Sequence, residues 1–396
     1  MDCWRSPHRH RKFAPVTYRW IDSTEDLQVI VDRLLAEPRY AMDTEFHRER
    51  TYFPKLALMQ IKGAGEIVLV DPLAVDLSPL KALFDSDVVA VFHAAQQDLD
   101  VLHHSVGAVP RRLYDTQLAA GFVGYSTPSL VSLLQSELRV TAAKGDRLTD
   151  WLRRPLTEDQ CSYAASDVAH LLELQDSLDA QLAADGRTEW AAEACIELLA
   201  KPVSGTDPSI AWTRLKDVRV LKPKARGVAR ALAAWRERRA MSIDAPVRQV
   251  LPDLAILGIS QRQPRTVSEL AQARGVDDRH TRGSISKDIL AAVEEGLREE
   301  VHLPAPDGDD LERNLRPAVA LVSAWVSEVA RAERIDTAML ATRNDLVAFL
   351  RGDSHARLSA GWRHDLLGDG IRRLVAGNAA LTFDGKGGLK LVDIPD

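Results

Sequence analysis

The sequence predicts a mixed α/β domain followed by two small helical domains. Its 396 residues exceed what one ordinary hydrophobic core supports. Three strand-like segments come early, and alternating strand and helix patterns follow them up to about residue 200. Beyond a segment rich in Gly and Pro after Lys201, the pattern is almost wholly helical. These observations predict a mixed sheet with helices on both faces, and then helical bundles.

The first domain begins with a helix signal. Ser23 and Thr24 precede a stretch in which apolar residues recur at helical spacing up to Leu34. Strands are expected next, and Gly63-Ala64-Gly65 suits a hairpin turn between the second and the third. The expected order is strands 40–46, 57–62 and 66–71, a helix at 79–84, a strand at 88–92, a helix at 96–104, a strand near Leu113 and a helix from Asp115.

One long helix is expected to close this domain. Thr157-Glu-Asp-Gln160 has the form of a capping box, and residues 161–183 contain neither Gly nor Pro. A further helix is expected around 189–199. We therefore divide the first half into a disordered tail (1–15), the α/β domain (16–200) and a linker (201–221).

The second half divides at the proline-rich, acidic segment HLPAPDGDD, residues 302–310. Helical patterns run from about 212 to 296 and again from 311 to the end. They predict one small all-α domain at 222–298 and another at 311–396. Residues 380–383 and 389–392, which flank a glycine-rich segment, suit a small terminal hairpin.

Composition narrows the class of protein. No segment approaches eighteen uninterrupted apolar residues, and the basic N-terminus lacks the apolar run of a secretory signal. The three cysteines are scattered, which suits a reducing cytoplasm. The formal charge is −6, yet residues 212–240 contain ten basic and two acidic residues. This basic stretch is either a solvated helix face or a surface that attracts phosphates.

Four carboxylates stand where a site for two metal ions would need them. Asp43 and Glu45 are two apart on a strand and so share a face, whereas Asp98 begins a helix that follows a strand. Asp167 lies on the long helix, and Tyr163 is one turn before it. Such carboxylates suit Mg²⁺ or Mn²⁺, and a pair of these ions can promote an in-line phosphoryl displacement.

Three segments resemble the exonuclease motifs of ribonuclease D: AMDTEFHRERTYFPKLALMQI (41–61), VFHAAQQDLDVL (91–102) and DWLRRPLTEDQCSYAASDVAHL (150–171). That family belongs to the DEDD exonucleases with a tyrosine in the third motif. The resemblance implies a ribonuclease H-like fold over residues 16–200. It also implies metal-binding roles for Asp43, Glu45, Asp98 and Asp167, and a role for Tyr163 in orienting the attacking water. Thr149 replaces the family's usual serine, a mild departure.

Further residues are candidates for contacts with substrate. Phe46 and Tyr52 suit stacking on a terminal base, although Phe46 also suits core packing. His93 matches a usual histidine of the second motif, with a substrate contact and simple packing both open. Lys144 and Arg154 resemble basic positions before the third motif, where they would contact phosphates or face water.

The helical half resembles a second module. Residues 229–253 and 264–276 resemble the helicase-and-ribonuclease-D C-terminal (HRDC) domain, and residues 334–350 and 361–377 resemble a diverged second copy. In this second copy Arg343 and Arg363 suit either RNA contacts or buried helix-capping roles. Together the resemblances imply a metal-dependent 3′→5′ exoribonuclease that trims tRNA precursors and other small structured RNAs, releasing nucleoside 5′-monophosphates.

Two alternatives stay open. One is a DNA 3′→5′ exonuclease of the same superfamily. The other is an RNA-binding scaffold without activity, although such relatives normally lose one of the acidic residues, and all four are present here. We further expect two bound divalent ions, a monomer, no membrane association and a cytoplasmic location.

Overall fold

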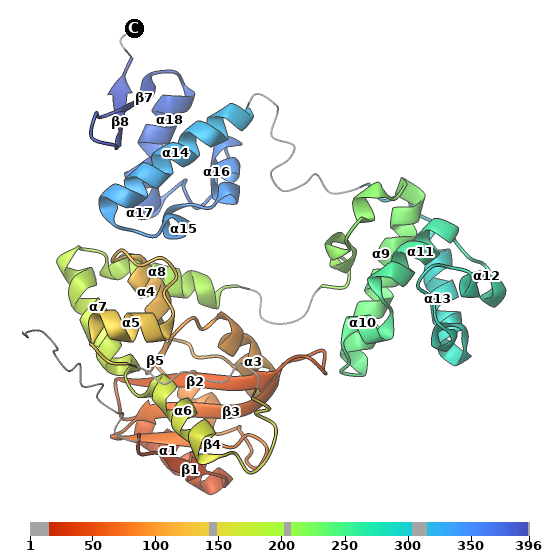
Figure 1. Ribbon diagram of the computed structural model, residues 1–396, viewed down its shortest axis with the longest axis horizontal. Coiled ribbons are helices and arrows are strands. Elements are labelled where there is room, and N and C mark those ends of the chain that lie inside the picture. Colours follow the sequence, from red (N-terminus) through yellow and green to blue (C-terminus); the bar gives the residue numbers. More distant parts are fainter. Residues whose placement is uncertain (1–15, 142–148, 202–206, 303–314, 395–396) are drawn as a thin grey trace, which may run out of the picture.

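The computed structural model describes residues 16–141, 149–201, 207–302 and 315–394 (Figure 1). They form an α/β domain, a first helical bundle and a second, mainly helical domain, as the sequence predicts. Within these ranges no helix is long and apolar enough to cross a membrane. The predicted tail (1–15) lies outside the described residues.

A six-stranded mixed sheet is the centre of the first domain. Its order is β1-β4-β3-β2-β5-β6: β2, β3 and β4 are antiparallel neighbours, and the other pairs are parallel. Strand β1, three residues long, was not predicted. The strands are β1 (Arg19–Ile21), β2 (Arg39–His47), β3 (Lys55–Gly63), β4 (Glu66–Val70), β5 (Val89–Phe92) and β6 (Leu113–Asp115).

Helices cover both faces of the sheet. One core packs α1, α2 and α3 on one face, and α6 and α7 pack on the other (Figure 1). The hairpin between β3 and β4 turns at Ala64 and Gly65, both with positive φ, as predicted. The helices are α1 (Thr24–Leu34), α2 (Leu80–Phe84), α3 (Gln96–Val106), α4 (Thr116–Gly121), α5 (Leu130–Glu137), α6 (Glu158–Val168), α7 (Leu171–Ala184) and α8 (Thr188–Leu199).

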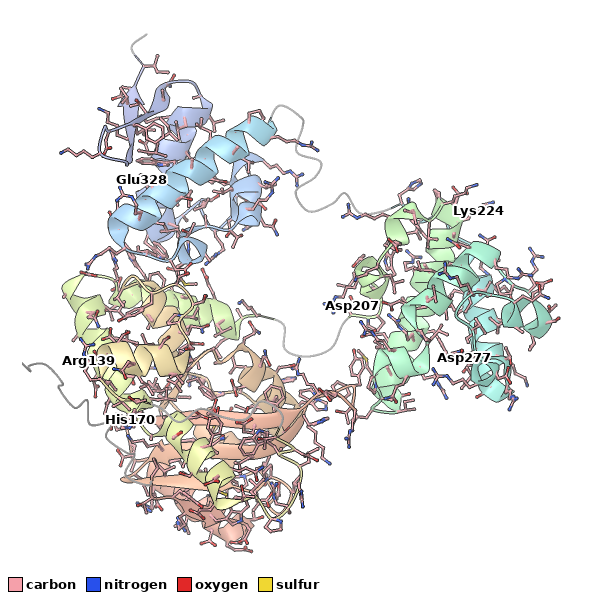
Figure 2. The ribbon with its side chains drawn as sticks, in the orientation of Figure 1. Arg139, His170, Asp207, Lys224, Asp277 and Glu328 are labelled. Carbon is pink, nitrogen blue, oxygen red and sulfur yellow. The ribbon has the colours of Figure 1, made fainter. Side chains whose placement is uncertain are left out.

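The prediction of one long helix over 161–183 is wrong. The predicted capping box at Thr157 and Gln160 is present, but α6 ends at Val168 and α7 begins at Leu171. His170 between them has φ −124° and ψ 9°, outside the helical region, and Figure 2 labels it. A sequence without Gly or Pro permits a helix, but here contacts from the sheet override that preference.

The first bundle begins earlier than predicted. Ala211, Trp212, Leu215, Val218 and Leu221 are buried in its core, so the predicted linker (201–221) is too long and the bundle starts well before residue 222. Its elements are η1 (Ala211–Arg214), η2 (Val218–Val220), α9 (Pro223–Ser242), α10 (Val247–Val250), α11 (Asp253–Arg262), α12 (Val267–Ala271), η3 (Asp278–Thr281) and α13 (Gly283–Gly296).

The second helical domain ends in the predicted hairpin. Strands β7 (Ala379–Phe383) and β8 (Leu389–Asp393) pair in an antiparallel register, so this domain is not wholly helical. Its helices are α14 (Leu315–Glu333), α15 (Thr337–Leu340), α16 (Arg343–Leu350), α17 (Gly361–Arg363), the π-helical turn η4 (His364–Gly368) and α18 (Asp369–Val375).

Candidate active site

The four predicted carboxylates come from three separate segments that the fold brings together. Asp43 and Glu45 lie on β2, opposite Gln60 and Leu58 of β3. Alternation along β2 places both on the face covered by α6 and α7. Asp167 stands in the last turn of α6, and Asp98 in the first turn of α3. A bulge between Glu45 and Phe46 ends this alternation, a common feature beside active sites.

Electrostatics confirm that these groups are neighbours. Burial raises the pKa of Asp43 well above its usual value, and the charges of Asp98, Asp167 and Glu45 raise it further. Burial, followed by the charges of Asp167 and Asp98, raises the pKa of Glu45 to about 8. Burial also raises the pKa values of Asp98 and Asp167 to about 7. The groups therefore resist ionising together unless a positive charge accompanies them.

Two hydrogen-bonding residues hold Asp98 in place. The Thr44 hydroxyl donates to Oδ1 of Asp98 at 2.5 Å, a contact that opposes the rise in its pKa. Asp115 is buried, and its carboxylate accepts from the backbone N–H groups of Ala94 and Ala95 at 3.1 and 2.8 Å. Asp115 also caps α4. It thereby fixes the loop that delivers the start of α3.

Tyr163 stands on α6 one turn before Asp167. Burial and the nearby charge of Asp167 raise the pKa of its hydroxyl above its usual range. The hydroxyl in turn lowers the pKa of Asp167 by hydrogen bonding. The Tyr163 ring stacks on Trp151, with ring centroids 6.2 Å apart. The hydroxyl therefore stays protonated at neutral pH and is available as a donor.

The donor set suits a hard divalent cation, since it consists of carboxylate oxygens held close in a partly buried place. Within the described ranges, however, no three His, Cys, Asp or Glu side chains already form a closed ligand set. Oδ1 of Asp98 already accepts from the Thr44 hydroxyl. We therefore expect small side-chain rotations on cation binding.

The loop after β2 carries the two aromatic candidates. Phe46 is half-buried against the sheet core, and the Arg48 guanidinium lies 5.6 Å from its ring centroid. The Tyr52 hydroxyl donates to Glu237 of the first bundle at 2.7 Å. The Tyr52 ring meets Phe53 edge to face, with centroids 4.8 Å apart. This loop therefore joins the candidate site to the first bundle.

Of the three other candidate substrate contacts, Arg154 and His93 bond to other parts of the fold, and Lys144 stays a prediction. The partners of Arg154 lie within the domain: its guanidinium pairs with Asp71 at 2.7 Å and donates to the carbonyls of Ala57 and Trp151. The ring nitrogens of His93 lie 2.9 Å from the Thr116 hydroxyl and 3.1 Å from the Pro128 carbonyl, which favours the packing role. Burial lowers the pKa of this histidine. Lys144 lies outside the described residues.

The structure also separates buried from exposed basic residues in the helical half. Arg236, in the basic stretch, is buried and pairs with Asp253 at 2.6 Å. Arg363 is buried and pairs with Glu193 and Glu197 of α8 at 3.1 and 3.0 Å, so its buried role is the one observed. Lys222, Lys224 and Arg238 remain on the surface of the first bundle, and Figure 2 labels Lys224 there.

Comparisons with known proteins identify the family of this chain. A family model described as 3'-5' exonuclease matches residues 18–183, and the HRDC domain model matches residues 225–293. Ribonuclease D of Acidiphilium cryptum is 36% identical over 387 residues, covering 95% of this chain and 97% of the relative. The chain belongs to the ribonuclease D family of 3′→5′ exoribonucleases.

Other members of the family agree. Ribonuclease D of Gluconacetobacter diazotrophicus is 37% identical over 92% of this chain and 94% of its own length. The crystal structure of Escherichia coli RNase D matches with a TM-score of 0.81 and 29% identity, covering 91% of this chain and 99% of that one. The catalytic core of RRP6 from Trypanosoma brucei matches with a TM-score of 0.59 and 26% identity, over 72% and 80% of the two chains.

Sequence reasoning missed three polar residues around the carboxylates. Asp115 was seen only as the start of a helix. Gln60 and Lys62 of β3 lie on the same face as Asp43, because each is paired in register with a residue of that face of β2. A sequence signal existed for Gln60 and Lys62, since these two polar residues interrupt the otherwise apolar segment from Leu56 to Lys62.

Proposed function

We propose that this chain hydrolyses RNA from the 3′ end with two divalent ions, Mg²⁺ or Mn²⁺, and releases nucleoside 5′-monophosphates. The observation that carries the proposal is the convergence of Asp43, Glu45, Asp98 and Asp167, each with a raised pKa. Four carboxylates in one partly buried place destabilise the fold unless cations neutralise them. The complete set, with Tyr163, favours an active enzyme over a silent scaffold.

In this proposal the four carboxylates hold the cations. When bound, divalent cations supply positive charge that stabilises a phosphoryl transition state and make water more acidic. Tyr163 would donate a hydrogen bond from its protonated hydroxyl and so orient the attacking water. Thr44 and Asp115 would keep Asp98 in place through the hydrogen bonds described above.

We further propose that the strand upstream of the scissile bond passes the loop after β2. A hollow of about 600 Å³ lies there, and its lining includes Arg48, Tyr52, Arg214 and Arg248. Gln97, next to Asp98 on α3, lines it as well. Guanidinium groups from both domains suit phosphate oxygens, and the Tyr52–Phe53 pair suits stacking on a base. Phe46 would stack nearer to the 3′ end.

Small structured RNAs such as tRNA precursors are the proposed substrates. The related E. coli RNase D is described as an exoribonuclease involved in structured RNA processing. The two helical domains beside the exonuclease domain provide room for the body of such an RNA. We also propose that the chain acts as a monomer in the cytoplasm, where its buried free Cys161 and Cys195 would stay reduced.

The test is a time course on a 5′-labelled RNA with a single-stranded 3′ tail, in Mg²⁺, Mn²⁺ or chelator. We expect a ladder that shortens from the 3′ end only with metal. Asp43→Asn should abolish it, whereas Asp85→Asn, a change at an exposed aspartate on the surface, should leave it intact. A ladder in chelator would refute metal dependence, and faster shortening of the matched DNA would favour a DNA exonuclease.

A further inference from the structure

The break between α6 and α7 lies close to the candidate active site. Helix α6 ends at Val168, one residue after Asp167, and the chain leaves helical geometry at His170 before α7 begins. The position of Asp167 relative to β2 therefore depends on how the end of α6 is held. Carbonyl groups at a helix end need partners from elsewhere.

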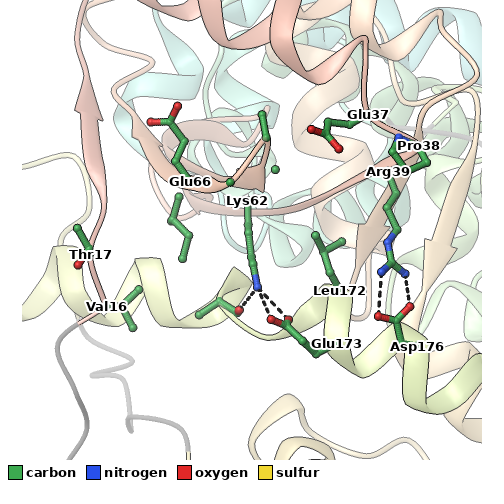
Figure 3. A pocket seen from close by; sticks show the side chains of 15 residues that line it. Val16, Thr17, Glu37, Pro38, Arg39, Lys62, Glu66, Leu172, Glu173 and Asp176 are labelled. Carbon is green, nitrogen blue, oxygen red and sulfur yellow. Dashed lines mark hydrogen bonds and ion pairs between the residues drawn. The ribbon is translucent and has the colours of Figure 1, made fainter.

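Lys62 of β3 provides such a partner. Its ammonium group donates to the Ala169 carbonyl and to both carboxylate oxygens of Glu173, at 2.8 and 2.9 Å (Figure 3). A cation at this position also suits the negative end of the α6 dipole. Lys62 is paired in register with Ala41, two residues before Asp43, so it spans from the carboxylate-bearing face of the sheet to the helix break.

We propose that Lys62 is a positioning residue for the exonuclease reaction. By tying the Ala169 carbonyl to β3, it sets how far Asp167 stands from Asp43 and Glu45. Its Glu173 contact keeps the ammonium group directed at the break. The proposal rests on the proposed function, because it assigns Asp167 to the cation site.

Arg39 offers a matched control, because it lines the same pocket between the sheet and α7 as Lys62 does. It lies on β2, and its guanidinium pairs with Asp176 of α7 at 2.7 Å (Figure 3). It also donates to Gln175 at 3.0 Å. Arg39 thus ties the sheet to α7 as Lys62 does, but beyond the break. A loss of general stability would be shared by both variants, whereas displacement of Asp167 would follow only from the loss of Lys62.

The experiment compares Lys62→Met, Lys62→Arg, Arg39→Met and the wild type in kcat, KM and the Mn²⁺-induced rise in melting temperature. We expect Lys62→Met to lower kcat at least about tenfold with KM nearly unchanged, because small misplacements of catalytic groups are costly. Lys62→Met should also reduce the Mn²⁺-induced rise in melting temperature. Lys62→Arg should restore most of both quantities, and Arg39→Met should leave both near wild type.

Equal effects of Lys62→Met and Arg39→Met, or an unchanged kcat in Lys62→Met, would overturn the positioning role. A wild type that neither cleaves RNA nor responds to Mn²⁺ would instead overturn the proposed function. The two failures are therefore distinguishable in one set of measurements.

Gln60 carries a second, independent inference. Its side chain is fully buried, and neither its Nε2 nor its Oε1 has a hydrogen-bond partner within the described residues. Buried amides are almost always paired, so an unpaired one calls for an explanation. Gln60 is directly opposite Asp43 in the antiparallel register, which places the two Cβ atoms about 4.5–5.5 Å apart on one face.

We infer that the Gln60 amide gains its partner when the site binds its cations. Its N–H group would then donate to the Asp43 carboxylate as that side chain turns to the cations, and would hold it in the ligating rotamer. Supporting hydrogen bonds of this kind commonly change metal affinity about 10–100-fold. This inference also rests on the proposed function.

Gln60→Met tests it through melting temperature with and without Mg²⁺ or Mn²⁺, and through metal affinity by calorimetry. We expect the metal-free variant to melt higher than the wild type, because an unpaired buried amide is gone. Its apparent metal Kd should rise about tenfold or more. Gln175→Met is the control: this glutamine is also buried but bonded to Arg39, so its loss should lower melting and spare metal affinity.

An unchanged metal Kd in Gln60→Met would overturn this inference. A lower melting temperature of the metal-free variant would also overturn it, because that outcome shows that the Gln60 amide is already hydrogen-bonded without metal. If the wild type binds no metal, the proposed cation site itself is wrong.

Discussion

The two helical domains are attached to the exonuclease domain in different ways. The first bundle has a core of its own, drawn from residues 211–301. It meets the loop after β2 through polar contacts. The Asp244 carboxylate accepts from the backbone N–H groups of Tyr52 and Phe53, both at 3.1 Å, and Tyr52 donates to Glu237.

The second helical domain shares a continuous core with α4, α7 and α8. Trp362 stacks on Trp190 of α8, with centroids 4.5 Å apart, and meets Phe122 edge to face. The Asp336 backbone N–H donates to the Gly121 carbonyl at 2.8 Å. Arg363 adds its buried ion pairs with α8.

The difference indicates separate tasks. A shared apolar core makes the second domain a structural part of the exonuclease domain, although its sequence resembles a nucleic-acid-binding module. Polar contacts at one loop leave the first bundle as a separate unit beside the candidate site. Interfaces of this polar kind permit relative motion more readily than apolar ones.

The largest expected effect comes from breaking the shared core. Trp362→Ala should cost about 3–5 kcal/mol of unfolding free energy, as is usual when a buried tryptophan is truncated. Because the core is shared, the loss should reach the exonuclease domain. Hydrogen exchange of the α4 and α8 amides should therefore speed up in the variant.

Trp212→Ala, in the core of the first bundle, is the matched control, since this tryptophan is also almost fully buried. It should speed up exchange in α9 and leave α4 and α8 as in the wild type. Unchanged exchange of α8 in Trp362→Ala would show that the second domain is only loosely attached.

A smaller effect follows from a contrast in charge. The buried charge of Arg363 is compensated by two glutamates, whereas burial raises the pKa of Asp43 and the charges of Asp98, Asp167 and Glu45 raise it further by repulsion. Their folded pKa values, about 7 for Asp98 and Asp167 and about 8 for Glu45, exceed unfolded values near 4. The folded state therefore binds more protons, and its stability falls as pH rises from about 4 to 8.

Asp43→Asn should relieve part of this repulsion. In chelator at pH 8, we expect its unfolding free energy to exceed that of the wild type by about 1–3 kcal/mol. The difference should vanish near pH 4, where the carboxylates of both proteins are protonated. Denaturant unfolding at the two pH values measures it. A difference of the same size at both would show that repulsion is not its cause.

The smallest expected effect concerns the polar contact of the first bundle. Tyr52→Phe removes one hydrogen bond to Glu237, which is worth about 0.5–1.5 kcal/mol. A double-mutant cycle with Glu237→Met, which removes the acceptor, isolates this coupling in the unfolding free energy. The control is the pair Tyr18 and Glu158, whose 3.1 Å hydrogen bond lies within one domain and is removed by Tyr18→Phe. Zero coupling between Tyr52 and Glu237 would mean that this contact does not hold the bundle.

Most elements of the α/β domain were predictable because their signals are local. Period-two and helical spacing, the hairpin turn at Ala64 and Gly65 and the capping box at Thr157 each occupy a few consecutive residues. The break at His170 was not predicted, and the Ala169 carbonyl beside it accepts from Lys62, 107 residues away in sequence. Strand β1 was not predicted, and it is paired with β4, a strand from another part of the sequence.

The sequence by itself determined the carboxylate set and the family, because motif order and spacing survive without coordinates. Only the tertiary structure decided which charged residues form ion pairs within the fold. Along the chain Arg154 and Arg236 suit contacts with phosphate or water, and Arg363 suits either an RNA contact or a buried role. In the structure each is paired with an acidic group from another segment. Burial and pairing are properties of packing between segments, and a linear pattern does not contain them.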